Sequence, residues 1–239
     1  MPLALTPWHT PPSLLELNSE DVHLWRFPLV SQEPLEHLLD EQELQRAKSL
    51  LRPDKARALV VARARLRQIL AGYLALAPQE LTFAYGPVGK PELVGLVAPP
   101  AFNLAHSGNW GLCAVAGRGE VGVDVETITP ALDYASLARR FFSEAENQWL
   151  RDCREARRRR CFFRIWTRKE AWLKGKGGGF SEPDQALGAA HLAVGCSYDG
   201  TWWLRNVPVA RGVVAALALS RESSAVQCWN GWMDCHKFL

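Results

Sequence analysis

The sequence predicts an α+β fold made of two similar halves that form a pseudo-twofold pair within one chain. Segments with helical periodicity and segments typical of strands both recur along the 239 residues, as expected for helices packed on a few strands. A hydrophobic strand is predicted near the end of each half, at 110–116 and at 212–219. Because Gly117-Arg118-Gly119 marks a natural midpoint, we place the first half at 1–118 and the second at 119–239.

The first half is predicted to place helices between its strands. Residues 1–20 are rich in proline and are expected to be irregular. The alternation of Val22–Phe27 indicates a strand. Two helices are predicted at about 31–51 and 54–76, separated by Pro53, because proline interrupts a helix. The remaining predictions are strands at 81–85, 102–104 and 111–116, a turn at 86–91 and a polar loop at 105–109.

The second half opens with a predicted strand at 121–126. Ser143 and Glu146 have the spacing of a capping box, which places a helix start at Ser143. A longer helix is predicted at about 155–174, and the glycines that follow it would end it. Further strands are predicted at 191–196, 201–204 and 213–219, and the tail 228–239 is expected to pack along the second half.

Composition excludes several classes of protein. Hydrophobic residues make up 48% and charged residues 22%, which is typical of a globular domain. The net charge of +3 is too small to indicate nucleic-acid binding. The uncharged stretch 93–117 contains Pro99-Pro100 and several polar residues, so we expect strands and loops there and no membrane span. The six cysteines lack zinc or disulfide spacing, and no basic leader precedes an apolar run, so we expect reduced thiols and a cytoplasmic protein.

The clearest chemical signal is the strand Val121-Gly122-Val123-Asp124-Val125-Glu126. A strand has a period of two, so its three valines face one way while Asp124 and Glu126 converge on the other face. Gly122 shares that face and would leave room between the backbone and a ligand. Paired carboxylates repel unless a cation lies between them, and hard oxygen ligands suit Mg²⁺ or Mn²⁺. A solvated face of an edge strand is the alternative interpretation.

A second signal lies on the predicted helix at 155–174. Phe162, Trp166, Glu170 and Lys174 share one side of that helix at spacings of four residues. Glu170 therefore continues an aromatic face that we expect to be buried, and a buried carboxylate needs a partner. Lys174 lies one turn away and could be that partner. An ordinary surface Glu–Lys pair would give the same spacing.

Two further segments could bind an anion. His106 and Ser107 follow a predicted strand, where their side chains could meet a phosphate, although a buried structural histidine is a common alternative. Lys90 and Pro91 lie on a rigid turn, where a lysine offers a point charge to phosphate or is simply solvated. The run Arg157–Arg160 is either a solvated helix face or a docking surface for an acidic partner, and we do not expect it to bind nucleic acid.

Taken in order, these segments resemble the Sfp-type 4′-phosphopantetheinyl transferases of the holo-acyl carrier protein synthase superfamily. No single motif is specific, but five in the family's order are, and the likeness spans about Val22 to Leu219. The matching segments are Gly89-Lys90-Pro91, Phe102-Asn103-Leu104-Ala105-His106-Ser107, Gly122-Val123-Asp124-Val125-Glu126, Arg140-Phe141-Phe142-Ser143 with Glu146, and Trp166-Thr167-Arg168-Lys169-Glu170-Ala171-Trp172-Leu173-Lys174.

The resemblance implies a transferase that moves phosphopantetheine from coenzyme A to a serine of an apo acyl or peptidyl carrier protein and releases 3′,5′-ADP. It implies a monomeric pseudodimer whose active site lies in the cleft between the halves. Asp124, Glu126 and Glu170 would hold Mg²⁺ on the pyrophosphate, Glu170 would act as the general base, directly or through a water, and Lys174 would neutralise the leaving phosphate. Synthesis of fatty acids, polyketides or nonribosomal peptides would use such an enzyme.

The resemblance also assigns a binding site for the 3′-phosphate and adenosine end of coenzyme A. His106, Ser107, Lys90 and Pro91 match the family's motifs there. Arg57 is carried over on a poorer match, and Arg46 and Lys48 are weaker candidates. Many relatives have serine where this chain has Ala105, so a hydroxyl that can contact a coenzyme A phosphate is missing.

The sequence leaves two other classes of function open. A metal-dependent nuclease or phosphohydrolase would explain the acidic residues and Lys174, but it would leave the segments around His106 and Lys90 without a role. A non-catalytic module that binds carrier proteins would use the Arg157–Arg160 face. For the transferase we expect that face to dock the carrier, since carriers are usually acidic around the modified serine.

Overall fold

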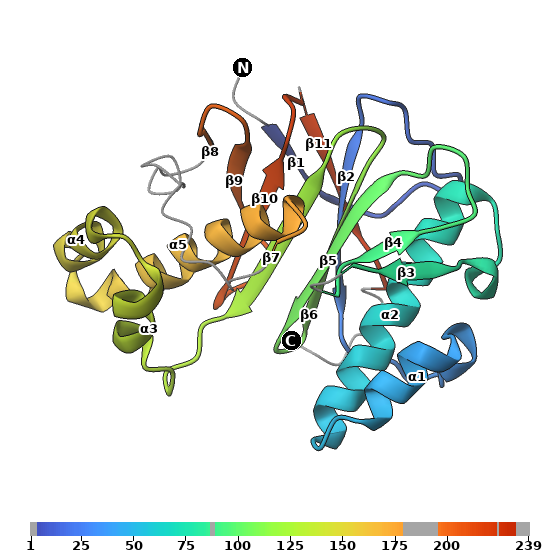
Figure 1. Ribbon diagram of the computed structural model, residues 1–239, viewed down its shortest axis with the longest axis horizontal. Coiled ribbons are helices and arrows are strands. Elements are labelled where there is room, and N and C mark those ends of the chain that lie inside the picture. Colours follow the sequence, from blue (N-terminus) through green and yellow to red (C-terminus); the bar gives the residue numbers. More distant parts are fainter. Residues whose placement is uncertain (1–3, 87–88, 179–195, 224, 233–239) are drawn as a thin grey trace.

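Two long helices, each packed against a β-sheet, define the architecture (Figure 1). The computed structural model describes residues 4–86, 89–178, 196–223 and 225–232. Helix α2 (Pro53–Leu74) begins with a proline at its first position and ends at Ala75 in the left-handed conformation. Helix α5 (Glu155–Gly175) lies over the other sheet. The mixed α+β fold class is therefore confirmed.

The strands form two larger sheets and one hairpin. The first sheet has five strands in the order β1-β11-β2-β6-β5, the second has four in the order β7-β10-β9-β8, and β3 pairs with β4. The bounds are β1 Ala4–His9, β2 Val22–Pro28, β3 Phe83–Tyr85, β4 Pro91–Leu93, β5 Ala101–Ser107, β6 Trp110–Ala116, β7 Val121–Thr127, β8 Cys196–Tyr198, β9 Trp203–Val207, β10 Val213–Leu219 and β11 Ala225–Asn230.

Three apolar layers hold these elements together. The core between the two sheets contains Leu24 and Ala114 from the five-stranded sheet, with Val123 and Leu217 from the four-stranded sheet. A second layer lies between α2 and the five-stranded sheet. The third lies between α5 and β10, where small side chains such as Ala216 let the helix approach closely. The sheets therefore sit between the two helices.

Most predicted elements of the middle of the chain are confirmed, including the helices at 54–76 and 155–174 and the strand at 121–126. The continuous helix predicted at 31–51 is wrong. Its residues form a short 3₁₀ turn at Glu36–Leu38 and helix α1 (Glu41–Lys48). Asp40 separates them because its side chain accepts a hydrogen bond from the backbone N–H of Glu43 and starts a new helix.

The polar loop predicted at 105–109 is also wrong. Strands β5 and β6 continue through it and leave only Gly108-Asn109 as the turn, so His106 and Ser107 lie at the end of a strand. The helix start at Ser143 is confirmed, with the capping box between Ser143 and Glu146 at the beginning of α4 (Glu144–Asp152). Helix α3 (Tyr134–Phe141) was not predicted.

The two ends of the described chain differ most from expectation. Residues 1–20 are not uniformly irregular, because β1 pairs in parallel with β11. Strand β11 lies between β1 and β2, so the tail at 228–232 packs in the sheet of the first half and not along the second half. Of the strand predicted at 191–196, only Cys196 belongs to the described residues.

Two expectations from composition can be compared with the described ranges. None of their helices is both long and apolar enough to cross a bilayer. The five cysteines that the structure describes are free thiols.

Candidate active site

Strand β7 and helix α5 cross at Gly122, and this crossing positions the candidate site. A Cβ atom on Gly122 would lie 1.9 Å from the carbonyl oxygen of Ala171 and 2.4 Å from the backbone nitrogen of Gly175. The space beside Gly122 is therefore filled by α5, and the expectation that it leaves room for a ligand is wrong. The close approach brings Glu170 and Lys174 of α5 over the face of β7 that carries Asp124.

The predicted acidic residues and Lys174 do come together at this crossing. Lys174 Nζ donates a hydrogen bond to Asp124 Oδ1 at 2.6 Å. The sequence offered Lys174 as a possible partner of Glu170 on the same helix, but its side chain reaches Asp124 on strand β7. Asp124 is 3% exposed, and its other oxygen, Oδ2, is buried with no hydrogen-bond partner. Such a carboxylate oxygen is costly to bury unless a cation or donor satisfies it.

The charges in this cluster perturb one another. Burial raises the pKa of Asp124 to about 7, with Lys174 opposing the shift and the carboxylates of Glu126 and Glu170 adding to it. Burial also raises the pKa of Glu170, against the attraction of Lys174. Burial would lower the pKa of Lys174, but the nearby carboxylates, Asp124 first, raise it. Three acidic groups and one ammonium thus share a desolvated space.

The donor set of this cluster fits a hard divalent cation. It offers carboxylate oxygens, one of them the unpartnered Oδ2 of Asp124, and an excess of negative charge. Within the described ranges, however, no three His, Cys, Asp or Glu side chains are arranged to hold a metal ion. The ammonium of Lys174 supplies the positive charge beside Asp124 here. The site with three carboxylate ligands therefore stays a prediction.

Glu126 is held from the neighbouring sheet. Its Oε2 accepts a hydrogen bond of 2.7 Å from Ser107 Oγ, which in turn accepts one of 3.1 Å from the backbone N–H of Thr127. Asn103, also on β5, accepts a hydrogen bond from the backbone N–H of Val123. Ser107 was expected to bind coenzyme A, but it joins β5 to β7 and orients the carboxylate of Glu126.

A cation-lined pocket of about 200 Å³ opens beside the carboxylate cluster. Lys174 belongs to both, so the two regions share one side chain. Lys90, Pro91 and His106 line the pocket, as expected. Its other lining residues are Arg46, Leu59, Arg63, Gly89, Asn103, Leu104 and Gly178.

Arg63 is a residue of this pocket that the sequence did not single out. Its side chain is largely buried, and its Nη1 has no hydrogen-bond partner. The guanidinium lies over the ring of Tyr85, with 5.4 Å between its Cζ and the ring centroid. Arg63 appeared in the sequence only as one of several basic positions on the helix, because periodicity alone does not show which of them faces a pocket.

The other predicted contacts to coenzyme A differ in position. Lys90 Nζ lies 3.3 Å from the carbonyl oxygen of Gly175, which ties the β3–β4 hairpin to the end of α5. Arg57 is exposed and lines a separate hollow beside residues 29–36, away from the pocket. Ala105 is 4% exposed and packs in the core between the sheets. A serine at this position would therefore place its hydroxyl in that core and not in the pocket.

His106 is exposed at the pocket. Desolvation by the surrounding protein lowers the pKa of its imidazole to about 4, and the charges of Lys174, Arg63 and Lys55 lower it as well. A phosphate placed among these cations would favour the charged form of the imidazole. Two of the pocket's cations have carboxylate partners just outside it: Lys174 pairs with Asp124, and Lys90 Nζ lies 3.5 Å from Glu120 Oε2. The buried Nη1 of Arg63 has no hydrogen-bond partner among the described residues.

Carboxylates beside a cation-lined pocket, as on this α+β fold, are an arrangement typical of enzymes that transfer phosphoryl groups. Comparison with known proteins gives the particular family. The sequence profile of the 4′-phosphopantetheinyl transferase superfamily matches residues 120–204. The 4′-phosphopantetheinyl transferase HetI of Nostoc sp. is 40% identical over 184 residues, which cover 74% of this chain and 78% of the relative.

Other bacterial proteins agree. A Synechocystis sp. protein named for the same activity is 38% identical over 72% of this chain and 73% of its own length. The 4′-phosphopantetheinyl transferase AcpT of Salmonella typhi is 39% identical over 47% of this chain and 56% of its own length. The chain belongs to the 4′-phosphopantetheinyl transferase superfamily, and the predicted enzyme class is confirmed.

Proposed function

We propose that the carboxylate cluster and the cation-lined pocket form one active site, which moves 4′-phosphopantetheine from coenzyme A to a serine of an apo acyl or peptidyl carrier protein. The observation that carries the proposal is the position of Lys174, which pairs with Asp124 and also lines the pocket. A pyrophosphate between the two regions would meet cations on one side and the metal-binding carboxylates on the other.

The pocket is suited to the 3′-phosphate and adenosine end of coenzyme A. Arg46, Arg63, Lys90 and His106 surround it, and the unpartnered Nη1 of Arg63 is a buried donor that a phosphate oxygen would satisfy. Pro91 stiffens the turn that carries Lys90. We leave Ser107 and Arg57 out of this binding site, because Ser107 supports Glu126 and Arg57 lies in another hollow.

Asp124, Glu126 and Glu170 would hold a divalent metal, for which we propose Mg²⁺, with Mn²⁺ as a substitute. Their oxygen donors are of the type these ions prefer, and the unpartnered Oδ2 of Asp124 would gain a partner. When bound, the metal would neutralise charge on the phosphate oxygens. Ser107 would fix the direction of the Glu126 carboxylate through its 2.7 Å hydrogen bond.

In the reaction we propose, the carrier serine oxygen forms a bond to the β-phosphorus of coenzyme A, and the bond from that phosphorus to the bridging oxygen breaks. Glu170 accepts the serine proton, directly or through a water, and burial favours this because it raises the pKa of Glu170. The bridging oxygen leaves with 3′,5′-ADP and keeps the electron pair. Lys174, held protonated by the carboxylates, stabilises the charge that develops on it.

We infer that the site lies between two halves, 1–118 and 119–239, of a monomer that works as a pseudodimer. The support is that Arg63, Lys90 and His106 come from the first half, while Asp124, Glu170 and Lys174 come from the second. Each half packs one long helix on one sheet. Strand β11 crosses this boundary, since it lies in the sheet of the first half.

Intact-mass spectrometry of apo carrier proteins, incubated with coenzyme A, Mg²⁺ and this protein, tests the proposed function. We expect the carrier to gain the mass of one phosphopantetheine group and 3′,5′-ADP to appear in equal amount. Glu170→Gln serves as the matched inactive control. An unchanged mass across fatty-acid, polyketide and peptide carriers, with hydrolysis of phosphate esters or nucleic acid instead, would replace the transferase with a phosphohydrolase. Binding of a carrier without modification would indicate a docking module.

A further inference from the structure

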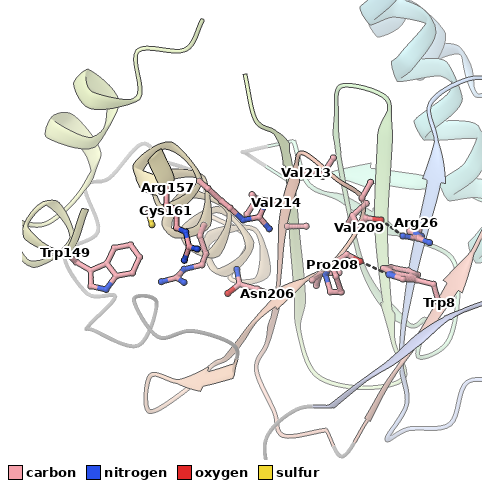
Figure 2. A pocket seen from close by; sticks show the side chains of 15 residues that line it. Trp8, Arg26, Trp149, Arg157, Cys161, Asn206, Pro208, Val209, Val213 and Val214 are labelled. Carbon is pink, nitrogen blue, oxygen red and sulfur yellow. Dashed lines mark hydrogen bonds between the residues drawn. The ribbon is translucent and has the colours of Figure 1, made fainter. Parts of the chain in front are cut away.

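A wide hollow lies away from the carboxylate cluster, under the N-terminal half of α5. It has a volume of about 850 Å³. In Figure 2, Trp149, Arg157, Cys161 and Asn206 line one part of it. The other part is lined by Trp8 and Arg26 beside the β9–β10 turn. We call this hollow the arginine groove, because Arg26, Arg157, Arg160 and Arg164 line it.

The groove divides the Arg157–Arg160 run into two pairs. Arg158 and Arg159 are bound locally: Arg158 donates to the carbonyl oxygens of Arg151 and Cys153, and Arg159 to those of Thr129 and Leu132. Arg157 and Arg160 line the groove, and within the described ranges their side chains form no hydrogen bond or ion pair. The run therefore does not form one surface, because four consecutive helical residues point in four directions.

The free pair belongs to a longer stripe on α5. Arg157, Arg160 and Arg164 follow one another at spacings of three and four residues, so they share a face. Arg164 lies over the ring of Trp149, at 4.5 Å from its centroid, and Arg26 lies over Trp8, at 4.6 Å. These stacking contacts hold two cations on the groove walls. The described lining contains no Asp or Glu, so its fixed charges are all positive.

We propose that the arginine groove docks an acidic segment of the carrier protein, with Arg157 and Arg160 making the ionic contacts. This deepens the proposed function and rests on it. The argument is charge complementarity: an open groove with positive walls, aromatic surfaces and two unpaired guanidinium groups fits carboxylate-bearing polypeptide. Arginine also binds carboxylates in pairs of parallel hydrogen bonds, which fixes orientation as well as charge.

The distance to the active site suits such a partner. Helix geometry places Arg164 about 9 Å and Arg157 about 20 Å along α5 from Glu170, at 1.5 Å per residue. A domain of about 100 residues has a radius of gyration of about 13 Å, so it spans both places. One carrier can therefore contact the groove while its serine reaches the carboxylate cluster. The docking contacts then act on encounter and leave the chemical step to other residues.

The test compares two double variants that remove the same charge from the same helix. Arg157→Gln with Arg160→Gln empties the groove of its free cations, and Arg158→Gln with Arg159→Gln is the matched control. Transfer is measured against carrier concentration at low and moderate salt, and circular dichroism checks that both variants fold. For the groove variant we expect the carrier KM to rise about three- to tenfold at low salt and to depend less on salt. Its kcat and coenzyme A KM should stay within about twofold of wild type.

Each other outcome has a distinct meaning. Equal carrier KM values and equal salt dependence for the two variants and the wild type overturn the groove as a docking site. Equal increases in both variants mean that the carrier responds to the general field of the helix, which also overturns it. A collapse of kcat in the groove variant would show that these arginines position α5 and do not dock the carrier. Failure of the wild type to modify any carrier would instead reject the proposed function itself.

Discussion

Two lysines of α5, five residues apart in the sequence, pair with buried carboxylates in different ways. Lys169 Nζ lies 3.0 Å from both carboxylate oxygens of Glu146, and both side chains are at most 6% exposed. Lys174 contacts only one oxygen of Asp124, and the other oxygen is left without a partner. Both carboxylate oxygens of Glu146 are therefore satisfied and this pair is complete. The Asp124 pair is incomplete, because one carboxylate oxygen can still accept a hydrogen bond or bind a cation.

The surroundings explain the difference. Glu146 also accepts a hydrogen bond from the backbone N–H of Ser143, so the Lys169 pair closes the start of α4 against α5. Asp124 instead has two more carboxylates near it, which add to the rise in its pKa. A buried pair that is satisfied on all sides serves the fold, whereas one with surplus charge is prepared for a ligand.

We expect the largest loss of activity from substitutions in the carboxylate cluster around Asp124. Glu170→Gln or Asp124→Asn should reduce transfer about 10²- to 10⁴-fold, because each removes a proton acceptor or metal ligand. Glu126→Ala should cost less, since Mg²⁺ readily keeps a water in place of a ligand. Initial rates of carrier modification measure these losses, and thermal melting should show that the variants stay folded. Wild-type rates for Asp124→Asn in saturating Mg²⁺ would contradict the assignment.

The complete pair should show the reverse pattern. Lys169→Met removes the cation that lies 3.0 Å from the buried carboxylate of Glu146, which should lower the free energy of unfolding by about 3–5 kcal/mol. Adding Glu146→Gln to Lys169→Met removes the buried carboxylate charge as well and should recover part of that loss. Urea denaturation monitors both. A Lys169→Met protein that is as stable as wild type but inactive would move Lys169 from the fold to the reaction.

Gly122→Ala tests the crossing of β7 and α5, which brings Glu170 and Lys174 of the helix close to Asp124 of the strand. The new methyl group would meet the backbone of Ala171 at 1.9 Å, so strand and helix must separate. We expect a loss of about 1–3 kcal/mol in unfolding free energy from overpacking. Activity should fall at least about tenfold, because Glu170 and Lys174 move away from Asp124. Full activity in a destabilised protein would separate packing from positioning at this crossing.

Ala105→Ser adds a hydroxyl group to the apolar core between the two sheets. Because Ala105 packs between the sheets, the hydroxyl should cost about 1–2 kcal/mol of stability and leave the coenzyme A KM unchanged. Ala105→Gly is a useful comparison, since it removes the methyl group without adding polarity. A clear fall in the coenzyme A KM for the serine variant would place this side chain at the pocket after all.

His23 extends the comparison to a buried polar side chain that lies outside the carboxylate cluster. Trp25 Nε1 donates to the hydroxyl of Tyr73, and the same hydroxyl shares a hydrogen bond of 2.7 Å with His23 Nδ1. His23 Nε2 has no partner within the described part of the chain. Burial lowers the pKa of His23. The unfolded chain therefore takes up a proton at a higher pH than the folded protein does, and stability falls as pH drops below about 6.5.

We expect His23→Gln to reduce this loss of stability between pH 7 and pH 5 while leaving transfer activity at pH 7 unchanged. Urea midpoints measured at both pH values give the comparison. An identical pH dependence in the variant and the wild type would mean that other groups dominate acid unfolding. An inactive variant would mean that His23 contributes to the transfer reaction although it lies outside the carboxylate cluster.

The central motifs could be predicted from the sequence because their geometry is local. The alternation of β7 and the four-residue spacing of Glu170 and Lys174 fix their faces without knowledge of the rest of the fold. What could not be predicted depends on contacts between distant segments. Lys174 pairs with Asp124 across 50 residues, and Ser107 supports Glu126 from another sheet. No periodicity shows which of several acceptors a lysine will reach.

The same limit explains the errors in the fold. The helix predicted at 31–51 was divided because the side chain of Asp40 caps α1, a choice that a run of leucines does not reveal. Strand β11 has no partner nearby in the sequence, since it pairs with β1 and β2 at the other end of the chain. Arg63 becomes a candidate ligand only when α2 is placed beside the pocket.

The position of β11 has a consequence for how the protein is made. The five-stranded sheet stays split between β1 and β2 until β11 enters it, although β2, β5 and β6 end by Ala116. Ribosomes add about 5–20 residues per second, so roughly 5–20 s separate the synthesis of Ala116 from that of Ala225. During that interval the emerging chain carries an unpaired strand edge that can pair with other nascent chains. Slow translation would lengthen the time for which this edge is exposed. The need for chaperones should therefore depend on how soon β11 is synthesised.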